Sequence, residues 1–81
     1  MQITVYAFAI LRERLNHSKI ELKVPSGTRV DSLWGYLGLD PVEFSQWSHR
    51  ILFAVNREYV SSSAILKEGD EVALIPPVAG G

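Results

Sequence analysis

Strict alternation of apolar and polar side chains in two early segments constrains the fold more than any other feature of the sequence. In the first segment, Ile3, Val5 and Ala7 alternate with Gln, Thr and Tyr, and in the second, residues 19–24 alternate without a break. Successive side chains of a strand point to opposite faces, so each segment predicts a strand with one buried face. The intervening residues 9–15 have the apolar spacing of a short helix.

The middle of the chain predicts one main helix. Four apolar residues have the i, i+3, i+4, i+7 spacing that places them on one helix face. They are Val30, Leu33, Trp34 and Leu37. Thr28 and Asp31 have the pattern of a capping box, with Asp at the position usually taken by Glu, and Gly38 is a natural stop. A second start signal at residues 40–43 predicts a short helix that ends at about Trp47.

The last third of the chain predicts three more strands. Residues 52–56 and 71–75 are apolar runs of strand length, and residues 59–60 are expected to form a short edge strand. Gly69 lies in a tight turn that requires a positive φ. The prolines at 76–77 prevent the last strand from continuing.

This order of elements predicts an α+β fold. Two strands, a helix, and three further strands bury one face of a mixed sheet against one main helix. The right-handed crossover rule places the first and last strands parallel and adjacent, which is the ubiquitin-like β-grasp layout. We expect residues 1–77 to form this domain and residues 78–81 to form a flexible tail. The expected core comprises Leu22, Val30, Leu33, Val55, Val72 and Leu74.

The composition restricts the possible functions. The net charge of the 81 residues is -1, so no basic field attracts nucleic acid or an anionic membrane. No apolar run approaches the length of a membrane span, and no signal-peptide pattern precedes the first strand. We therefore expect a cytoplasmic protein that binds neither nucleic acid nor membrane. The absence of cysteine excludes disulfides, thiolate nucleophiles and iron–sulfur centres.

Few side chains have the pattern of a catalytic or metal site. His17 and His49 have no carboxylate at ligand spacing, so we expect no metal centre. The serines at 61–63 lack the context of an activated nucleophile, and the glycines form no phosphate loop. Trp34 is expected in the core. Three carboxylates are interpreted as helix-start residues: Asp31, Asp40 and Glu43.

The C-terminal segment is the strongest functional candidate. Proline fixes φ, so Pro77 gives the tail a defined direction as it leaves the domain. Glycine has no Cβ, so Gly80 and Gly81 let a terminal carbonyl pass through a narrow channel. The terminal carboxylate is ionised at neutral pH and is a poor electrophile, so a partner must activate it. Val78 and Ala79 would lie in the same channel; the alternative is a frayed terminus without function.

Motifs along the whole chain resemble the small-subunit family of molybdopterin synthase. The terminal motif is specific to this family, and the others are supportive. Residues 38–49 carry no signature of the family. The motifs are Phe8 with Arg12-Glu13, Ala54-Val55-Asn56 with Val60, Glu68-Gly69-Asp70-Glu71-Val72, and Pro76-Pro77-Val78-Ala79-Gly80-Gly81.

The resemblance implies a sulfur carrier that is not itself an enzyme and holds no permanent cofactor. An ATP-dependent adenylyltransferase would convert the carboxylate of Gly81 to a transient acyl-adenylate. A sulfur donor protein would then convert the acyl-adenylate to a thiocarboxylate. The large synthase subunit, expected in a heterotetramer with this one, would accept the tail and transfer the sulfur to a pyranopterin precursor of the molybdenum cofactor.

Strand alternation also predicts a partner interface. Phe8 and Ile75 are expected on the sheet face opposite the core, beside the tail, with Tyr59 near them and Arg12 at the margin. Exposed apolar patches often mark partner surfaces. We expect one surface to serve both the large subunit and the activating enzyme; the alternative is that a helix or loop covers it.

Three other functions remain open at this point. A thiamine-pathway sulfur carrier would share the fold and the Gly-Gly end, although residues 76–79 favour a function in molybdopterin synthesis. A ubiquitin-like modifier that is joined to lysines is the second alternative. The third is a β-grasp binding module with an inert tail.

Overall fold

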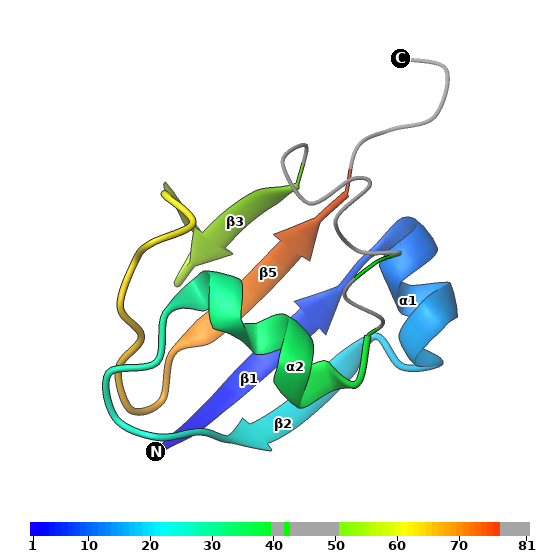
Figure 1. Cartoon of the computed structure of the whole chain (residues 1–81). Coiled ribbons are helices and arrows are strands. Elements are labelled where there is room, and N and C mark those ends of the chain that lie inside the picture. Colours follow the sequence, from blue (N-terminus) through cyan, green and yellow to red (C-terminus); the bar gives the residue numbers. More distant parts are fainter. Residues whose placement is uncertain (40–41, 43–50, 77–81) are drawn as a thin grey trace.

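The computed structural model describes residues 1–39, 42 and 51–76. In this part of the chain, a mixed five-stranded sheet carries one main helix on one of its faces (Figure 1). The strands are β1 (Gln2–Ala7), β2 (Lys19–Lys23), β3 (Leu52–Val55), β4 (Glu58–Val60) and β5 (Glu71–Ile75). The helical segments are α1 (Ala9–Leu15), the 3₁₀ turn η1 (Val30–Ser32) and α2 (Leu33–Leu37).

The strand order β2-β1-β5-β3-β4 places the last strand in the middle of the sheet. β1 and β5 run parallel, with Val5 beside Val72, and the other neighbours run antiparallel. A parallel pair needs a crossover connection, and α2 lies on that crossover. This arrangement confirms the predicted ubiquitin-like β-grasp fold of the α+β class. The predicted tail, residues 78–81, lies outside the described residues.

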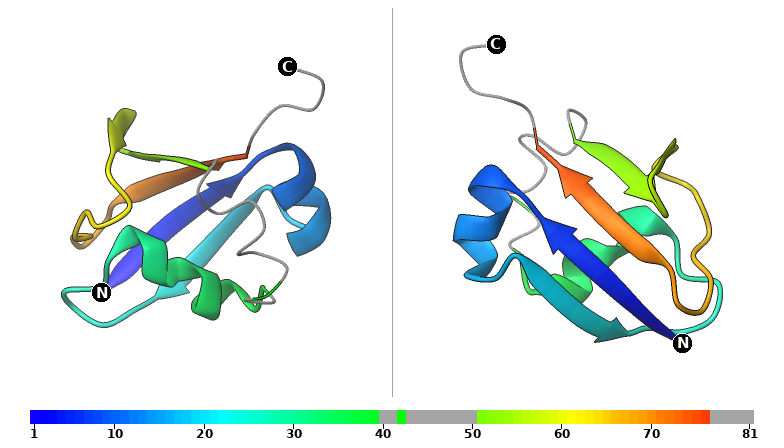
Figure 2. Two further views of the ribbon diagram at one scale, coloured as in Figure 1. Left: turned by 45° about the horizontal axis from the view of Figure 1, so that its top comes forward. Right: turned by 180° about the vertical axis from the view of Figure 1, so that it is seen from behind.

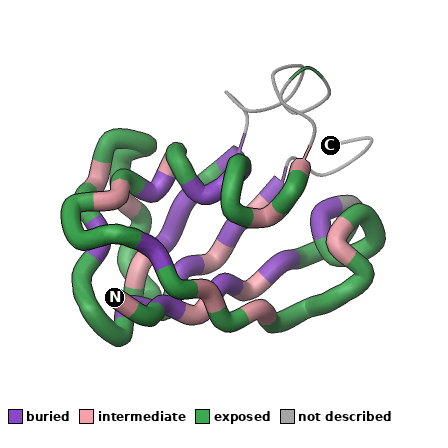
Figure 3. Tube along the Cα trace, turned by 60° about the horizontal axis from the view of Figure 1, so that its bottom comes forward, coloured by how far each residue is buried: buried purple, intermediate pink, exposed green. Residues whose placement is uncertain are grey.

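The hydrophobic core lies between α2 and the sheet face that α2 covers. Buried residues recur along the strands and alternate with more exposed ones (Figure 3). The ring centroids of Trp34 and Phe53 are 5.8 Å apart with a tilt of 57°, so the aromatic ring of α2 packs on β3. The fully buried side chains are Ile3, Val5, Leu11, Val30, Leu33, Val72 and Leu74.

Most of the predicted core is confirmed, with two corrections. Val30, Leu33, Val72 and Leu74 are completely buried, and Trp34 is buried as expected. Leu22 and Val55, in contrast, are only partly buried and pack against the margin of the core. Leu22 belongs to the edge strand β2, which has a neighbour on one side only, and Val55 is the last residue of β3.

The predicted capping box is wrong. The hydroxyl of Thr28 donates to the carbonyl oxygen of Pro25 at 2.7 Å, and the carboxylate of Asp31 accepts two hydrogen bonds from the guanidinium of Arg29. Thr28 is therefore engaged by the preceding turn and Asp31 by the side chain of Arg29, and the helix starts through the 3₁₀ turn η1 instead. Gly38 ends α2 with φ 74°, as predicted. The predicted helix at 40–47 lies outside the described residues, apart from residue 42.

Candidate functional site

The sheet face opposite α2 is left open by the described part of the chain. Seen from that side, no helix lies in front of the central strands (Figure 2, right). The side chains on this outer face alternate with core side chains along each strand. One row crosses the sheet from β1 to β4. It consists of Tyr6, Ala73, Ala54 and Tyr59, each paired with the next.

A second row lies at the end of the sheet where β5 finishes. Leu52 pairs with Ile75. Ala7 pairs with Leu74, so the residues that follow them, Phe8 and Ile75, lie at the same end of the sheet. Phe8 is 48% exposed and Leu52 is 53% exposed. We define the outer-face patch as Phe8, Leu52, Tyr59 and Ile75.

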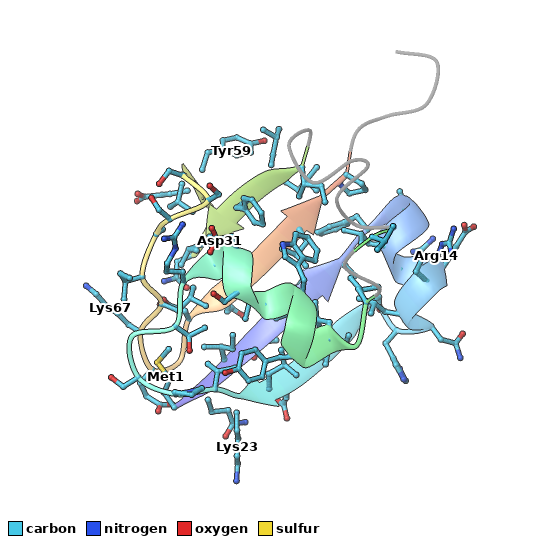
Figure 4. All side chains as sticks on the ribbon, in the orientation of Figure 1. Met1, Arg14, Lys23, Asp31, Tyr59 and Lys67 are labelled. Carbon is cyan, nitrogen blue, oxygen red and sulfur yellow. The ribbon has the colours of Figure 1, made fainter. Side chains whose placement is uncertain are left out.

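The structure brings three of the four predicted interface residues, Phe8, Tyr59 and Ile75, onto the outer face of the sheet. Tyr59 is 73% exposed and projects outward from β4 (Figure 4), while Ile75 is half-buried on the same face. Arg12 is exposed on α1, and its backbone N–H donates to the carbonyl oxygen of Phe8, so it lies one helical turn from that ring. Sequence reasoning missed Leu52. The signal was available, because Leu52 precedes the core residue Phe53 in an alternating strand.

An open groove of about 200 Å³ lies beside the patch on the outer face. It is lined by Tyr6, Phe8, Arg57, Glu71 and Ala73. The hydroxyl of Tyr6 donates to Oε2 of Glu71 at 3.0 Å across this groove. That hydrogen bond, followed by desolvation, raises the pKa of Tyr6, and the charge of Arg57 opposes the shift. The lining of the groove thus combines two aromatic side chains with one cation and one anion.

The turn between β3 and β4 carries Arg57 to the groove. Asn56 and Arg57 have φ values of 51° and 72°, which is the type I′ geometry of a two-residue hairpin. The side chain of Asn56 ties this turn to the start of β5. Its Oδ1 accepts from the backbone N–H of Glu71 at 3.0 Å, and its Nδ2 donates to Oδ1 of Asp70 at 2.9 Å.

The chain leaves the sheet next to the outer-face patch. β5 ends at Ile75, and the buried Pro76 is the last residue that the structure describes. The predicted tail site, Pro77, Val78, Ala79, Gly80 and Gly81, lies outside the described residues. The segment that carries the predicted chemistry therefore begins at the edge of the predicted partner surface.

Comparison with known proteins places the chain in a family. A family model described as the ThiS family matches residues 5–81. The chain belongs to the ThiS family. A molybdopterin synthase sulfur carrier subunit from Arabidopsis thaliana is 35% identical to this ThiS-family chain, over all of it and 84% of the plant protein. A protein of the same name from Mycobacterium tuberculosis is 34% identical, over all of this chain and 99% of its own length.

Two solved structures share the fold of this ThiS-family chain. Subunit 1 of a molybdopterin converting factor from Pyrococcus furiosus superposes with a TM-score of 0.77 at 29% identity, covering 96% of this chain and 99% of the archaeal one. Small archaeal modifier protein 1 from H. volcanii superposes with a TM-score of 0.78 at 26% identity, covering 95% and 98%. Both likenesses confirm the β-grasp fold over nearly the whole length.

Three kinds of feature bear on function in the described part of this ThiS-family chain: metal-ligand clusters, membrane-spanning helices and buried charges. Within residues 1–39, 42 and 51–76, no three side chains of the metal-ligating types are grouped as a metal site. None of the helices in the same ranges is long and apolar enough to cross a membrane. The one buried charged side chain among the described residues, Asp70, is engaged in the turn network that holds Asn56. The outer-face patch and groove are thus its clearest features for recognition.

Proposed function

We propose that this ThiS-family chain is the sulfur-carrier subunit of a molybdopterin synthase and carries sulfur as a thiocarboxylate on Gly81. The observation that carries the proposal is full-length similarity to proteins of that name, in a chain that carries Gly80-Gly81 after the two prolines that follow the last strand. The chain has no cysteine, so its C-terminal carboxylate is the natural place for a carried sulfur atom.

The proposed cycle has two steps on the carrier. A carboxylate oxygen of Gly81 attacks the α-phosphorus of ATP on an adenylyltransferase, and pyrophosphate leaves. A sulfide equivalent from a donor protein then attacks the activated carbonyl carbon, AMP leaves, and a thiocarboxylate remains. ATP is a substrate of the activating enzyme in this scheme, and the carrier itself needs no resident cofactor. We place this chemistry in the cytoplasm.

The catalytic site for sulfur transfer would belong to the large synthase subunit. We propose that the outer-face patch docks on that subunit, in a heterotetramer, and that residues 77–81 then enter its active site. Two observations support this: the patch is apolar and exposed, and β5 ends beside it, so a docked patch brings the tail to the same partner. Arg12 would contact the partner at the margin of the patch.

Thiocarboxylate formation tests this proposal directly. The purified chain is incubated with ATP, the activating enzyme and a sulfide source, and the intact mass is measured. We expect the mass change for replacement of one oxygen atom by sulfur, and the modification should map to Gly81 in the C-terminal peptide. An unmodified chain, under conditions in which a relative of the same name is loaded, would refute the proposal.

A second candidate function is a ubiquitin-like modifier. The structural similarity to small archaeal modifier protein 1, at 26% identity, supports this alternative function. The two functions share adenylation of Gly81 and differ in the acceptor, which is sulfur for a carrier and a lysine amine for a modifier. Isopeptide-linked conjugates in cells that express the tagged chain would support the modifier function. A thiamine-pathway carrier is less favoured, because the relatives compared above bear the molybdopterin synthase name.

A further inference from the structure

Arg57 occupies a backbone position that does not suit it. The second residue of a type I′ turn has a positive φ and favours glycine, yet Arg57 has φ 72° there. Four non-glycine residues in the described ranges have positive φ, and two of them are asparagines, which tolerate this conformation. The other two are Ala9 and Arg57. Of these two, only Arg57 lines the groove.

The fold does not need the side chain of Arg57 to hold this turn. The turn is fixed by Asn56, whose backbone N–H donates to the carbonyl oxygen of Glu71 at 2.8 Å and whose side chain bonds to Asp70 and Glu71. Strain of this kind gathers at functional sites when the surrounding structure holds it in place. An arginine at a turn position that favours glycine therefore indicates that the guanidinium serves recognition and not the stability of the fold.

The guanidinium of Arg57 has no partner within the described residues. The carboxylate that shares the groove, Glu71, accepts its hydrogen bond from Tyr6 instead, and no described residue forms an ion pair with Arg57. The only salt bridge between described residues joins Arg29 to Asp31, far along the chain from the groove. The positive charge of Arg57 thus lines the groove beside Tyr6 and Phe8 without a neutralising partner among the described residues.

We propose that Arg57 is the charged anchor of the outer-face groove, and that its ligand is a carboxylate side chain of the large synthase subunit. An apolar side chain next to that carboxylate packs against Phe8 and Ala73. This inference rests on the proposed function and adds to it a specificity-determining residue outside the outer-face patch.

The chemistry of the groove selects a single carboxylate. A guanidinium binds a carboxylate through two parallel hydrogen bonds, and partial exclusion of water by the aromatic rings strengthens such a pair. Glu71 also lines the groove, and its charge repels any further negative charge. A polyanion such as nucleic acid or a phosphate-rich ligand is therefore disfavoured, whereas one carboxylate beside an apolar side chain fits.

The test compares the affinity of the large subunit for the wild type and for Arg57→Gly. Glycine suits the turn, so Arg57→Gly should unfold at or above the temperature of the wild type. Loss of the anchor should nevertheless weaken binding by about ten-fold or more and reduce its dependence on salt concentration. Arg57→Lys keeps the positive charge but cannot form two parallel hydrogen bonds to a carboxylate, so its affinity should lie between those of the wild type and Arg57→Gly. Lys67→Ala, which removes an exposed positive charge elsewhere, should bind like the wild type.

Each outcome has a defined meaning. If the wild type binds the large subunit and Arg57→Gly binds equally well, the inference is overturned while the proposed function stands. If Arg57→Gly loses affinity for the activating enzyme alone, the assignment to the large subunit is wrong. If the wild type does not bind the large subunit at all, the proposed function fails and the inference fails with it.

Discussion

The carboxylate of Asp70 accepts a hydrogen bond from the side-chain amide of Asn56 at 2.9 Å, which joins two turns that lie 14 residues apart in sequence. The second carboxylate oxygen of Asp70 accepts from the backbone N–H of Lys67 at 2.7 Å. Asp70 is only 7% exposed, so these donors replace the water that its carboxylate would otherwise contact. The pair fixes the β3–β4 turn against the start of β5 and, with it, the position from which Arg57 projects.

Two substitutions of Asn56 should distinguish the stability that its side-chain hydrogen bonds contribute from the effect of its left-handed backbone conformation. Asn56→Gly keeps the left-handed φ without strain but removes the partner of Oδ1 of Asp70 and of the N–H of Glu71, and should cost about 1–3 kcal/mol of unfolding free energy. Asn56→Ala should cost about 1 kcal/mol more, because alanine is strained at φ 51°. Chemical denaturation measures both. Equal free energies of unfolding for Asn56→Gly and the wild type would show that these hydrogen bonds do not stabilise the fold.

The two faces of the sheet should respond differently to the same substitution. Leu33→Ala removes a completely buried side chain between α2 and the sheet and should cost about 2–5 kcal/mol. Leu52→Ala, on the outer face, should change the free energy of unfolding by no more than about 0.5 kcal/mol. Equal denaturation midpoints for the two variants would show that α2 does not form the core.

Ionisation of Tyr6 should be coupled to Glu71 at high pH. The hydrogen bond to Glu71 exists only while the phenol is protonated, so the pKa of Tyr6 in the folded state lies above its ordinary value of 10.0. The resulting stabilisation is fully present below the unfolded pKa and is lost as the pH rises through the folded pKa. NMR titration of the Tyr6 ring should show a lower pKa in Glu71→Gln; identical titration in both proteins would rule the coupling out.

Changes at the terminus should abolish sulfur loading without affecting the fold. Deletion of Gly81, or residues added after it, removes the carboxylate from the activating site, while the core residues are untouched. Gly80→Ala should reduce activity more than stability, because a Cβ obstructs a narrow channel. Circular dichroism controls for folding, and mass spectrometry measures thiocarboxylate formation. Normal loading of the Gly81 deletion is the result that contradicts the mechanism. Normal loading of Gly80→Ala with failed transfer would place the steric limit in the large subunit.

The outer-face patch should bind one partner at a time. If the large subunit and the activating enzyme both use Phe8, Tyr59 and Ile75, increasing amounts of one partner should displace the other from the immobilised carrier. Tyr59→Ala should weaken both interactions without destabilising the fold, because this side chain is 73% exposed. Recovery of a ternary complex with both partners on one carrier would contradict a shared surface.

The strands, the helix and their faces could be predicted because local patterns determine them. Alternation in residues 2–7 places Ile3 and Val5 in the core and Tyr6 on the opposite face, as the structure has them. The parallel pairing of β1 with β5 followed from the crossover rule. The prediction of a capping box was wrong because the same residues can bond elsewhere: Thr28 bonds to the preceding turn and Asp31 to the side chain of Arg29.

The groove could not be predicted because it depends on pairing between distant segments. Tyr6, Arg57 and Glu71 meet only in the assembled sheet, through the register of β1 and β3 against β5. The conformation of Arg57 was also not accessible, because the Asn-Arg pair lacks the glycine that usually identifies a type I′ turn. The predicted exposure of Phe8 needed only strand alternation, and it is confirmed.

The central position of β5 determines the order in which this molecule can be built. β5 is the last strand in sequence, yet β1 and β3 each pair with it and not with each other. Until β5 is in place, the rest of the sheet consists of two separate two-stranded hairpins, which are marginally stable in water at best. Such long-range closure is slow compared with local hairpin formation. A partner that recognises the outer face beside the end of β5 therefore meets only a chain that has already completed its sheet.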